Sequence, residues 1–286
     1  MDSCKNGEQK NQDKNWGPFS LRDRVTVITG GAGLLGRHHA EAILEAGGEP
    51  VLLDISQEAL TTASETIKET HGHAPACFSC DITKPEEVEA ISQSILDRFG
   101  HIDALINNAA NNPKVEQGKN FDRLENFPLD IWEKDIAVGL TGAMLCSRVF
   151  AEIMRRNSYG GVILNIASDL ALIAPDQRLY RIEGVSNDKQ PVKPVTYSVV
   201  KTGLLGLTRY CATYYAEHNI RVNALAPGGV EAGQSPAFIA RLHSLIPMGR
   251  MAKIDEYKGA VVFMLSDASS YMTGACLSID GGRTCW

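Results

Sequence analysis

The sequence has no excess of basic charge and lacks a long apolar run near its start. Lys and Arg number 28 against 34 Asp and Glu, which gives a formal net charge of −6. Because phosphate backbones and anionic membranes select basic surfaces, this balance argues against a nucleic-acid or membrane binder. The polar stretch over residues 1–18 resembles neither a signal peptide nor an anchor, and we expect a disordered tail there.

The cysteines follow neither a disulfide framework nor a metal-binding pattern. Seven are present, an odd number without a secretory signal, which is typical of reduced thiols in a cytoplasmic protein. Cys77 and Cys80 form a CxxC, but no second Cys pair or spaced His pair accompanies them in the sequence. We therefore predict no metal site, a cytoplasmic location and a small-molecule partner.

Short apolar runs bounded by Gly, Asp, Asn or Pro alternate with helical stretches along the chain. Such runs are typical of strands buried on both faces. The alternation predicts one α/β domain over residues 19–286, with a Rossmann-like, doubly wound parallel sheet. The runs lie at 25–28, 51–53, 104–106, 162–166, 222–225 and 276–279, and the helices are expected at 35–46, 57–70, 85–99, 129–156, 197–218 and 254–266.

Two connections are unusually long, over residues 109–128 and 170–196. Loops of this length in a compact domain are usually functional. In a doubly wound fold, ligands bind outside the carboxyl ends of the strands, and both loops leave strand ends. We expect these loops to form the substrate site.

A glycine-rich turn follows the first expected strand, where residues 29–36 are Thr-Gly-Gly-Ala-Gly-Leu-Leu-Gly. Three of its glycines have the GxGxxG spacing at the start of a helix. Positions without a side chain allow a tight turn and let backbone N–H groups approach a pyrophosphate at the helix N-terminus. The turn is therefore expected to bind a dinucleotide through Gly30, Gly31, Gly33, Leu34, Leu35 and Gly36.

Polar residues follow the next expected strands. Asp54 ends the second run, where its carboxylate can accept hydrogen bonds from the adenosine ribose and repel a 2'-phosphate. This position predicts NAD in preference to NADP, with Arg37 as the nearby cation that opposes the preference. Asp81 is nearly as well interpreted as a helix cap. The expected contacts further along the chain are Asp81, Ile82, Asn108, Ala109 and Ala110.

Tyr197 and Lys201 are four residues apart in a helical stretch, so their side chains lie about one turn apart on one face. An ammonium beside a phenol favours the phenolate and lowers the phenol pKa towards the range that acid/base catalysis needs. A YxxxK pattern alone is common by chance. Its position after the nucleotide-binding features favours a catalytic pair.

The order of these segments closely resembles the short-chain dehydrogenase/reductase family, from about residue 19 to the end. The similarity is to the common short-chain branch. The matching segments are the glycine-rich turn, Asp81-Ile82, Asn107-Asn108-Ala109, Asn165-Ile166-Ala167-Ser168, Tyr197 with Lys201, Ile220-Arg221-Val222-Asn223, Pro227-Gly228-Gly229-Val230, and Thr273-Gly274 through Asp280-Gly281-Gly282.

The resemblance implies a reaction and an assembly. Ser168 would hydrogen-bond the substrate oxygen, Tyr197 would transfer the proton, and Lys201 would orient the nicotinamide ribose. Hydride would pass between the nicotinamide and the carbon of a secondary alcohol or ketone. The resemblance further implies a homodimer or homotetramer through helices 129–156 and 197–218, and cofactor contacts from Pro227, Gly228 and Val230.

The chain departs from the family pattern at two places. Gly139 stands where members commonly carry a catalytic Asn, which is thought to hold a water molecule of the proton relay. We expect a further water molecule to fill the space beside Gly139. The glycine-rich turn also matches the TGxxGxxG spacing of the extended members, such as sugar-nucleotide epimerases. Too few residues follow Tyr197 for their separate substrate domain.

Polar side chains fill both long loops and predict a hydroxylated, sugar-like substrate. The candidate contacts are Asn111, Arg178 and Arg181, although solvated loop charge explains each Arg equally well. Overall similarity is nearest to bacterial members associated with surface-sugar or flagellin modification. The alternatives are an epimerase or dehydratase with retained NAD, a reductase of 3-oxoacyl substrates, and a non-catalytic NAD-binding module.

Overall fold

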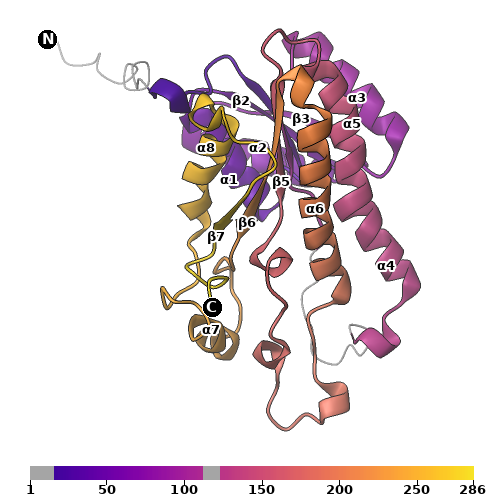
Figure 1. Cartoon of the computed structure of the whole chain (residues 1–286), viewed down its shortest axis with the longest axis vertical. Helices are drawn as coiled ribbons and strands as arrows, with labels where there is room; N and C mark the ends of the chain where they lie inside the picture. Colours follow the sequence, from indigo (N-terminus) through magenta and orange to yellow (C-terminus); the bar gives the residue numbers. More distant parts are fainter. Residues whose placement is uncertain (1–15, 112–122) are drawn as a thin grey trace, which may run out of the picture.

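The computed structural model describes residues 16–111 and 123–286, and these residues form one domain around a single parallel sheet (Figure 1). The strand order is β3-β2-β1-β4-β5-β6-β7, which confirms the doubly wound fold. The order in which strands are added reverses between β1 and β4, and such folds bind ligands in the crevice at the carboxyl ends of these two strands. The strands are β1 (Val25–Thr29), β2 (Glu49–Asp54), β3 (Ala76–Ser79), β4 (Ala104–Asn107), β5 (Gly161–Ile166), β6 (Ile220–Pro227) and β7 (Cys276–Ile279).

Helices cover both faces of the sheet, which is why the central strands are buried throughout (Figure 1). Two apolar cores result, one on each face. One face carries α1 (Leu34–Glu45), α2 (Gln57–His71) and α8 (Lys258–Leu265). The other face carries α3 (Pro85–Phe99), α5 (Gly142–Met154) and α6 (Val195–Tyr214).

The helix predicted over residues 129–156 is divided into three parts. α4 (Leu129–Ile136) continues through a π-helical turn at Ala137–Thr141 into α5. By length and composition, Leu129–Met154 could cross a membrane, with a mean hydropathy of 1.5. Half of its most apolar window is buried, and it packs against α3, α6 and β4. This run is therefore a core helix of the domain.

The region between β5 and α6 is more ordered than a loop. Three 3-10 turns lie in it, at Asp169–Ala171, Gln177–Tyr180 and Asn187–Lys189. The sequence also did not predict α7 (Pro236–His243), which packs against the second of these turns at the lower end of Figure 1. The other long connection lies largely outside the described residues, apart from a 3-10 turn at Leu124–Asn126.

The predicted N-terminal tail lies outside the described residues up to residue 15. Its last two residues do not fit the prediction, because a 3-10 helix spans Gly17–Phe19. Pro18 fixes the backbone of this turn, and the ring of Phe19 lies 6.4 Å from that of Phe263. The domain therefore begins slightly earlier than predicted.

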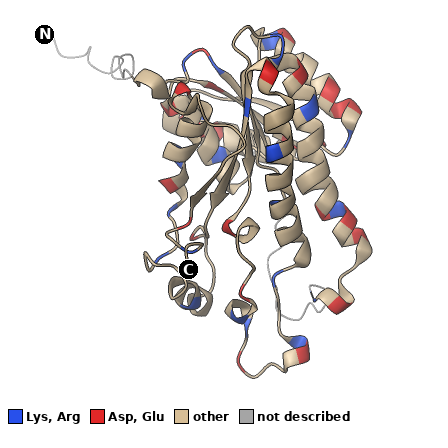
Figure 2. Cartoon of the chain, viewed as in Figure 1, with Lys and Arg blue, Asp and Glu red and all other residues tan. Residues whose placement is uncertain are grey.

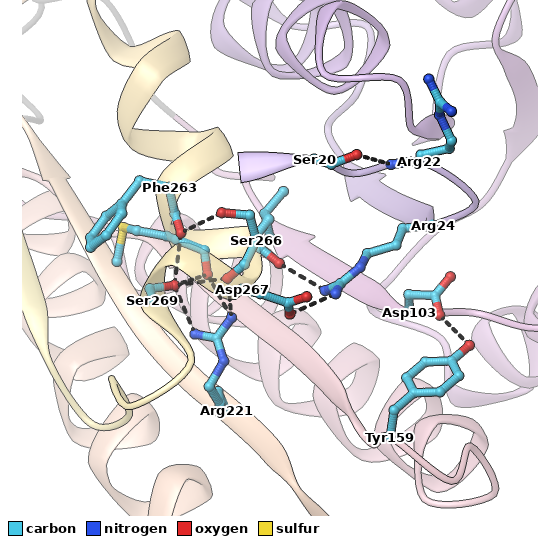
Figure 3. A network of polar contacts seen from close by, with 12 residues as sticks. Ser20, Arg22, Arg24, Asp103, Tyr159, Arg221, Phe263, Ser266, Asp267 and Ser269 are labelled. Atoms are coloured by element: carbon cyan, nitrogen blue, oxygen red, sulfur yellow. Dashed lines mark hydrogen bonds and ion pairs between the residues drawn. The ribbon is translucent and has the colours of Figure 1, made fainter. Parts of the chain in front are cut away.

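A dense polar network closes the amino-terminal edge of the sheet (Figure 3). The guanidinium of Arg221, near the start of β6, donates to the carbonyls of Met264, Ser266 and Met272 and to the Ser269 hydroxyl at 3.1–3.3 Å. Two of these carbonyls lie at the end of α8, where helix carbonyls lack helical partners. Arg221, part of the family-like segment, therefore joins β6 to the end of α8.

Candidate active site

The glycine-rich turn lies at the reversal point of the sheet, between the ends of β1 and β4. Gly30 adopts a left-handed φ of +61°, and a Cβ there would lie 2.9 Å from Cα of Ala109. A Cβ at Gly36 would lie 2.3 Å from the carbonyl oxygen of Gly30. α1 begins directly after Gly33, so the N–H groups of its first turn lack helical partners at this end of the sheet. The turn is a cradle that only glycines can form.

Asp54 at the end of β2 is positioned beside this turn. Its carboxylate accepts hydrogen bonds from the Ala32 N–H at 3.3 Å and the Ser56 N–H at 3.2 Å. The Nε of Arg37, in the first turn of α1, is buried without a hydrogen-bond partner in the described part of the chain. A carboxylate and a buried guanidinium donor thus flank the cradle. This set fits the ribose and phosphates of a dinucleotide.

Asn108 was predicted to contact the cofactor, but the structure uses its side chain to support the turn. Its Nδ2 donates to the carbonyls of Thr29 and Gly30 at 3.1 and 3.0 Å. The Thr29 hydroxyl in turn accepts from the N–H groups of Asn108 and Ala109. A cofactor contact through the Asn108 amide nitrogen is therefore unavailable without breaking the turn.

Asp81 and Ile82 follow β3, as predicted, but Asp81 caps its own turn. Its carboxylate accepts from the N–H and hydroxyl of Thr83, which lowers its pKa below the usual value. Ile82 is buried and packs against Gly142. The helix-cap interpretation of Asp81 therefore describes its present contacts.

The predicted catalytic residues converge at the carboxyl ends of β5 and the start of α6. Ser168 follows β5 directly and is buried. Lys201 is also buried, and its Nζ donates to the Ile166 carbonyl at 2.7 Å. The Nζ of Lys201 lies 5.9 Å from the centre of the Tyr197 ring, one helical turn away. The three side chains form one constellation, as expected from the sequence.

Burial dominates the electrostatics of this constellation. It raises the pKa of Tyr197, a rise that a hydrogen bond with the Ser168 side chain counters and the Asp169 carboxylate increases. Burial also lowers the pKa of Lys201 to about 8, and the charge of Lys193 adds to that effect. The Nζ of Lys193 lies 3.8 Å from the centre of the Tyr197 ring. Lys193 belongs to the long loop and was not singled out from the sequence.

Val200 packs against Gly139. A Cβ at Gly139 would lie 2.5 Å from Cγ1 of Val200, and Gly139 also lines the small cavity beside Tyr197 and Lys201. Val200 stands directly before Lys201, and its branched side chain is stiff. A side chain at residue 139 would therefore have to displace Val200.

A buried carboxylate shares the small cavity that Tyr197 and Lys201 line. Asp135, one turn before Gly139, accepts from the Thr196 hydroxyl at 2.5 Å and from Nδ2 of Asn111 at 3.1 Å. All of these residues line the cavity. Asn111, a predicted substrate contact, thus lies at the site, and nothing in the sequence indicated Asp135.

The two arginines predicted for substrate binding are exposed on the long loop. Arg178 is paired with Asp176, with hydrogen bonds of 2.7–3.1 Å, and its side chain is 77% exposed. The carbonyls of Arg178 and Arg181 accept from the guanidinium of Arg241 in α7. Arg178 therefore has a carboxylate partner already, and Arg241 is the arginine that fixes this turn.

The remaining predicted cofactor contacts follow the end of β6. Gly228 lies so close to β7 that a Cβ would meet Cα of Asp280 at 2.8 Å. Its carbonyl accepts from the Tyr257 hydroxyl at 2.9 Å, and Val230 forms a parallel bridge with Ala252. Pro227, Gly228 and Val230 thus stand at the same edge as the glycine-rich turn.

A parallel doubly wound sheet, a dinucleotide cradle at its reversal point and a Ser/Tyr/Lys constellation define a class of nicotinamide-dependent oxidoreductases. The sequence model of a family described as enoyl-(acyl carrier protein) reductase matches residues 31–284. The chain belongs to the short-chain dehydrogenase/reductase family.

Several similar proteins are named as dehydrogenases of hydroxylated compounds. The chain is 32% identical to a 2,5-dichloro-2,5-cyclohexadiene-1,4-diol dehydrogenase of Sphingobium indicum, over 92% of this chain and 98% of that protein. It is 30% identical to an NAD-dependent glycerol dehydrogenase of Listeria innocua, over 93% and 96%. A gluconate 5-dehydrogenase of Burkholderia cenocepacia, solved with NADP and tartrate, superposes with a TM-score of 0.80 at 27% identity, over 94% and 98%.

This protein is therefore an oxidoreductase that acts on alcohols or hydroxy compounds with a nicotinamide cofactor.

Proposed function

We propose that this protein is an NAD-dependent dehydrogenase that oxidises a secondary alcohol of a polar, hydroxylated small molecule. The proposal rests on the convergence of Ser168, Tyr197 and Lys201 beside the dinucleotide cradle. When bound, the nicotinamide supplies the hydride acceptor. The chain itself binds the alcohol oxygen, takes up its proton and keeps water from the buried site.

Each residue of the constellation has a separate task in this proposal. Ser168 hydrogen-bonds the substrate hydroxyl, and Tyr197 as phenolate accepts its proton. The ammonium of Lys201 favours that phenolate, and the charge of Lys193 over the ring acts in the same direction. Burial raises the Tyr197 pKa, and the hydrogen bond with the Ser168 side chain opposes that rise.

The cofactor preference is proposed from Asp54. Its carboxylate lies at the end of β2 beside the turn, where it can bind ribose hydroxyls and repel a 2'-phosphate. The glycerol dehydrogenase relative is named as NAD-dependent, whereas the gluconate dehydrogenase was solved with NADP. The preference for NAD in this chain therefore depends on Asp54, with the buried Nε of Arg37 opposing it.

The substrate class is proposed from the site walls and the relatives. Polar side chains, including Asn111 and Lys193, border the site. A larger cavity beside Lys193 is lined mostly by apolar groups, among them Pro175, Val195 and Val199. A compound with hydroxyl groups on a compact carbon ring or chain suits both surfaces. The nearness to surface-sugar enzymes stays a prediction.

A substrate panel tests the proposal. NADH absorbance would be followed with cyclic diols, glycerol, xylitol, gluconate, nucleotide sugars, 3-oxoacyl thioesters and steroid ketones. We expect oxidation of at least one polyol or cyclic diol with NAD. Turnover of 3-oxoacyl thioesters or steroids alone would refute the proposed substrate class.

Two alternatives have distinct signatures in the same assay. An epimerase or dehydratase would retain NAD on purification and give product without net NADH. A non-catalytic module would bind NAD and convert none of the compounds. Every observation that fits one of these alternatives also fits the proposed dehydrogenase.

We also propose a cytoplasmic homodimer or homotetramer. α6 carries few charged side chains (Figure 2), and its exposed Tyr210 and Tyr214 stack at 5.7 Å. Exposed Met144 of α5 and Val199 of α6 add to this apolar helical face. Burial of such a face between copies removes it from water. Light scattering that gives a monomer mass would contradict the assembly.

A further inference from the structure

A second lysine lies beside the Tyr197 ring, in a place where positive charge is unfavourable. The Nζ of Lys193 lies 3.8 Å from the centre of that ring. Its charge adds to the effect of burial, which lowers the pKa of Lys201 to about 8. α6 begins at Val195, so Lys193 also lies at the positive end of the helix dipole. The two ammonium groups and the helix end together favour an anion at this place.

The long loop between β5 and α6 holds the backbone of Lys193 in place. The Lys193 N–H donates to Oε1 of Gln177 at 2.9 Å, and Gln177 begins the second 3-10 turn of the loop. Pro194 follows directly, and a proline restricts both its own backbone and that of the residue before it. The Lys193 side chain is partly buried. The loop therefore presents this ammonium to the site at a defined position.

Lys193 also lines a cavity of about 340 Å³ beside the site. Among the described residues of its lining, Arg123 is the other cation, and Arg123 is paired with Glu125 at 2.7 Å. The charges of that pair cancel, so the described lining carries one net positive charge. The rest of the wall is mostly apolar and includes Leu124, Pro175, Val192, Pro194, Val195 and Val199. The cavity thus suits a carbon skeleton that carries a single negative charge.

We infer that Lys193 is a specificity-determining residue that binds a carboxylate of the substrate, so that the substrate is a hydroxy acid. This inference deepens the proposed function and rests on it. The reacting hydroxyl lies at the Tyr197 phenol, and the carboxylate pairs with the ammonium over the same ring. Hydride leaves the carbinol carbon for NAD, the hydroxyl proton goes to Tyr197, and the carboxylate keeps all its bonds. The single point charge of Lys193 matches the single charge of a carboxylate.

Matched pairs of an acid and its amide isolate the substrate charge. The compounds are the 2-, 3- and 4-hydroxycyclohexanecarboxylates and their carboxamides, each assayed with NAD by NADH absorbance. We expect the wild type to prefer at least one acid over its amide about tenfold or more in kcat/KM, the effect of one hydrogen bond to a charged group. In Lys193→Met, which loses the charge but keeps a long side chain, the preference should fall to within about threefold. Lys193→Arg keeps the charge and should keep the preference.

The ratio of acid to amide also separates substrate binding from catalysis, because it does not depend on the folded fraction of a variant. If Lys193 served only the Tyr197 phenolate, Lys193→Met would lower the turnover of acid and amide alike. An unchanged ratio in Lys193→Met would therefore overturn the inference, as would a wild type that oxidises the amides as well as the acids. Lys189→Met, at an exposed lysine of the same loop, is the matched control and should leave the ratio unchanged.

A binding titration tests the inference without turnover. Cyclohexanecarboxylate and cyclohexanecarboxamide have no hydroxyl group to oxidise, and calorimetry measures their binding to the NADH complex, in which the nicotinamide is uncharged. We expect Lys193→Met to weaken binding of the acid about tenfold and to leave the amide unchanged. A wild type that binds both compounds equally, or neither, would refute the role of Lys193. If the wild type oxidises no alcohol, the proposed function fails while this titration still decides the inference.

Discussion

Both the amino-terminal and the carboxyl edge of the sheet carry polar residues but use them differently. At the amino-terminal edge, Arg221 and Asp103 form hydrogen bonds with backbone groups and with the Ser269 and Tyr159 hydroxyls (Figure 3). At the carboxyl edge, Tyr197 and Lys201 line a small cavity, and the first N–H groups of α1 lack helical partners. Polar groups of the first edge stabilise the fold, and those of the second are placed for a ligand.

The largest test of this comparison is Tyr197→Phe at the carboxyl edge. Loss of the hydroxyl removes the proposed proton acceptor, so kcat should fall about a thousandfold. The affinity for NAD, measured by fluorescence titration, and the melting temperature should stay nearly unchanged. Tyr210→Phe, an exposed tyrosine on the same helix, is the matched control. A Tyr197→Phe enzyme that keeps more than about a tenth of the turnover would remove Tyr197 from the mechanism.

Arg221→Met at the amino-terminal edge should lower stability and leave turnover unchanged, which is the reverse of the effect expected from Tyr197→Phe. The substitution leaves the carbonyls of Met264, Ser266 and Met272 without their donor, and the unfolding free energy should fall by about 3 kcal/mol. Turnover per folded molecule should be unchanged. Denaturant titration measures the loss, with exposed Arg22→Met as control, since Arg22 contributes only its backbone N–H to the contacts drawn in Figure 3. If Arg221→Met lost turnover but kept its full stability, the assignment of a structural role to the amino-terminal edge would be wrong.

A smaller effect is expected from Asp54→Ser at the cofactor end of the carboxyl edge. Removing the carboxylate ends its repulsion of a 2'-phosphate, so the ratio of kcat/KM with NAD to that with NADP should fall at least about tenfold. Glu49→Gln, at the opposite end of the same strand, should leave the ratio unchanged. An unaltered ratio in Asp54→Ser would assign the cofactor choice to Arg37 or to another residue.

The two edges also differ in how far the sequence predicted them. Period and spacing predicted the sheet, the glycine-rich turn and the Tyr197–Lys201 pair, because each depends on local pattern. The family resemblance added Ser168 to that pair. The sequence could not show that Asn108 supports the turn, or that Arg178 pairs with Asp176. It also missed Asp169 with Arg283, because a contact between residues this far apart leaves no periodic signal.

Gly139 and Val200 give the smallest and most local test of the carboxyl edge. Gly139→Asn places a Cβ against the stiff Val200 side chain, and such overpacking costs about 1–3 kcal/mol. Turnover should fall less than about tenfold, since residue 139 contributes no side chain to the present site. Adding Val200→Ala should restore the melting temperature, because the smaller side chain gives the new Asn its room. Gly206→Asn is the matched control, because a Cβ there meets nothing within 4 Å. If Val200→Ala does not restore the melting temperature of Gly139→Asn, the two positions are independent. The contact with Val200 is then not the cause of the lost stability.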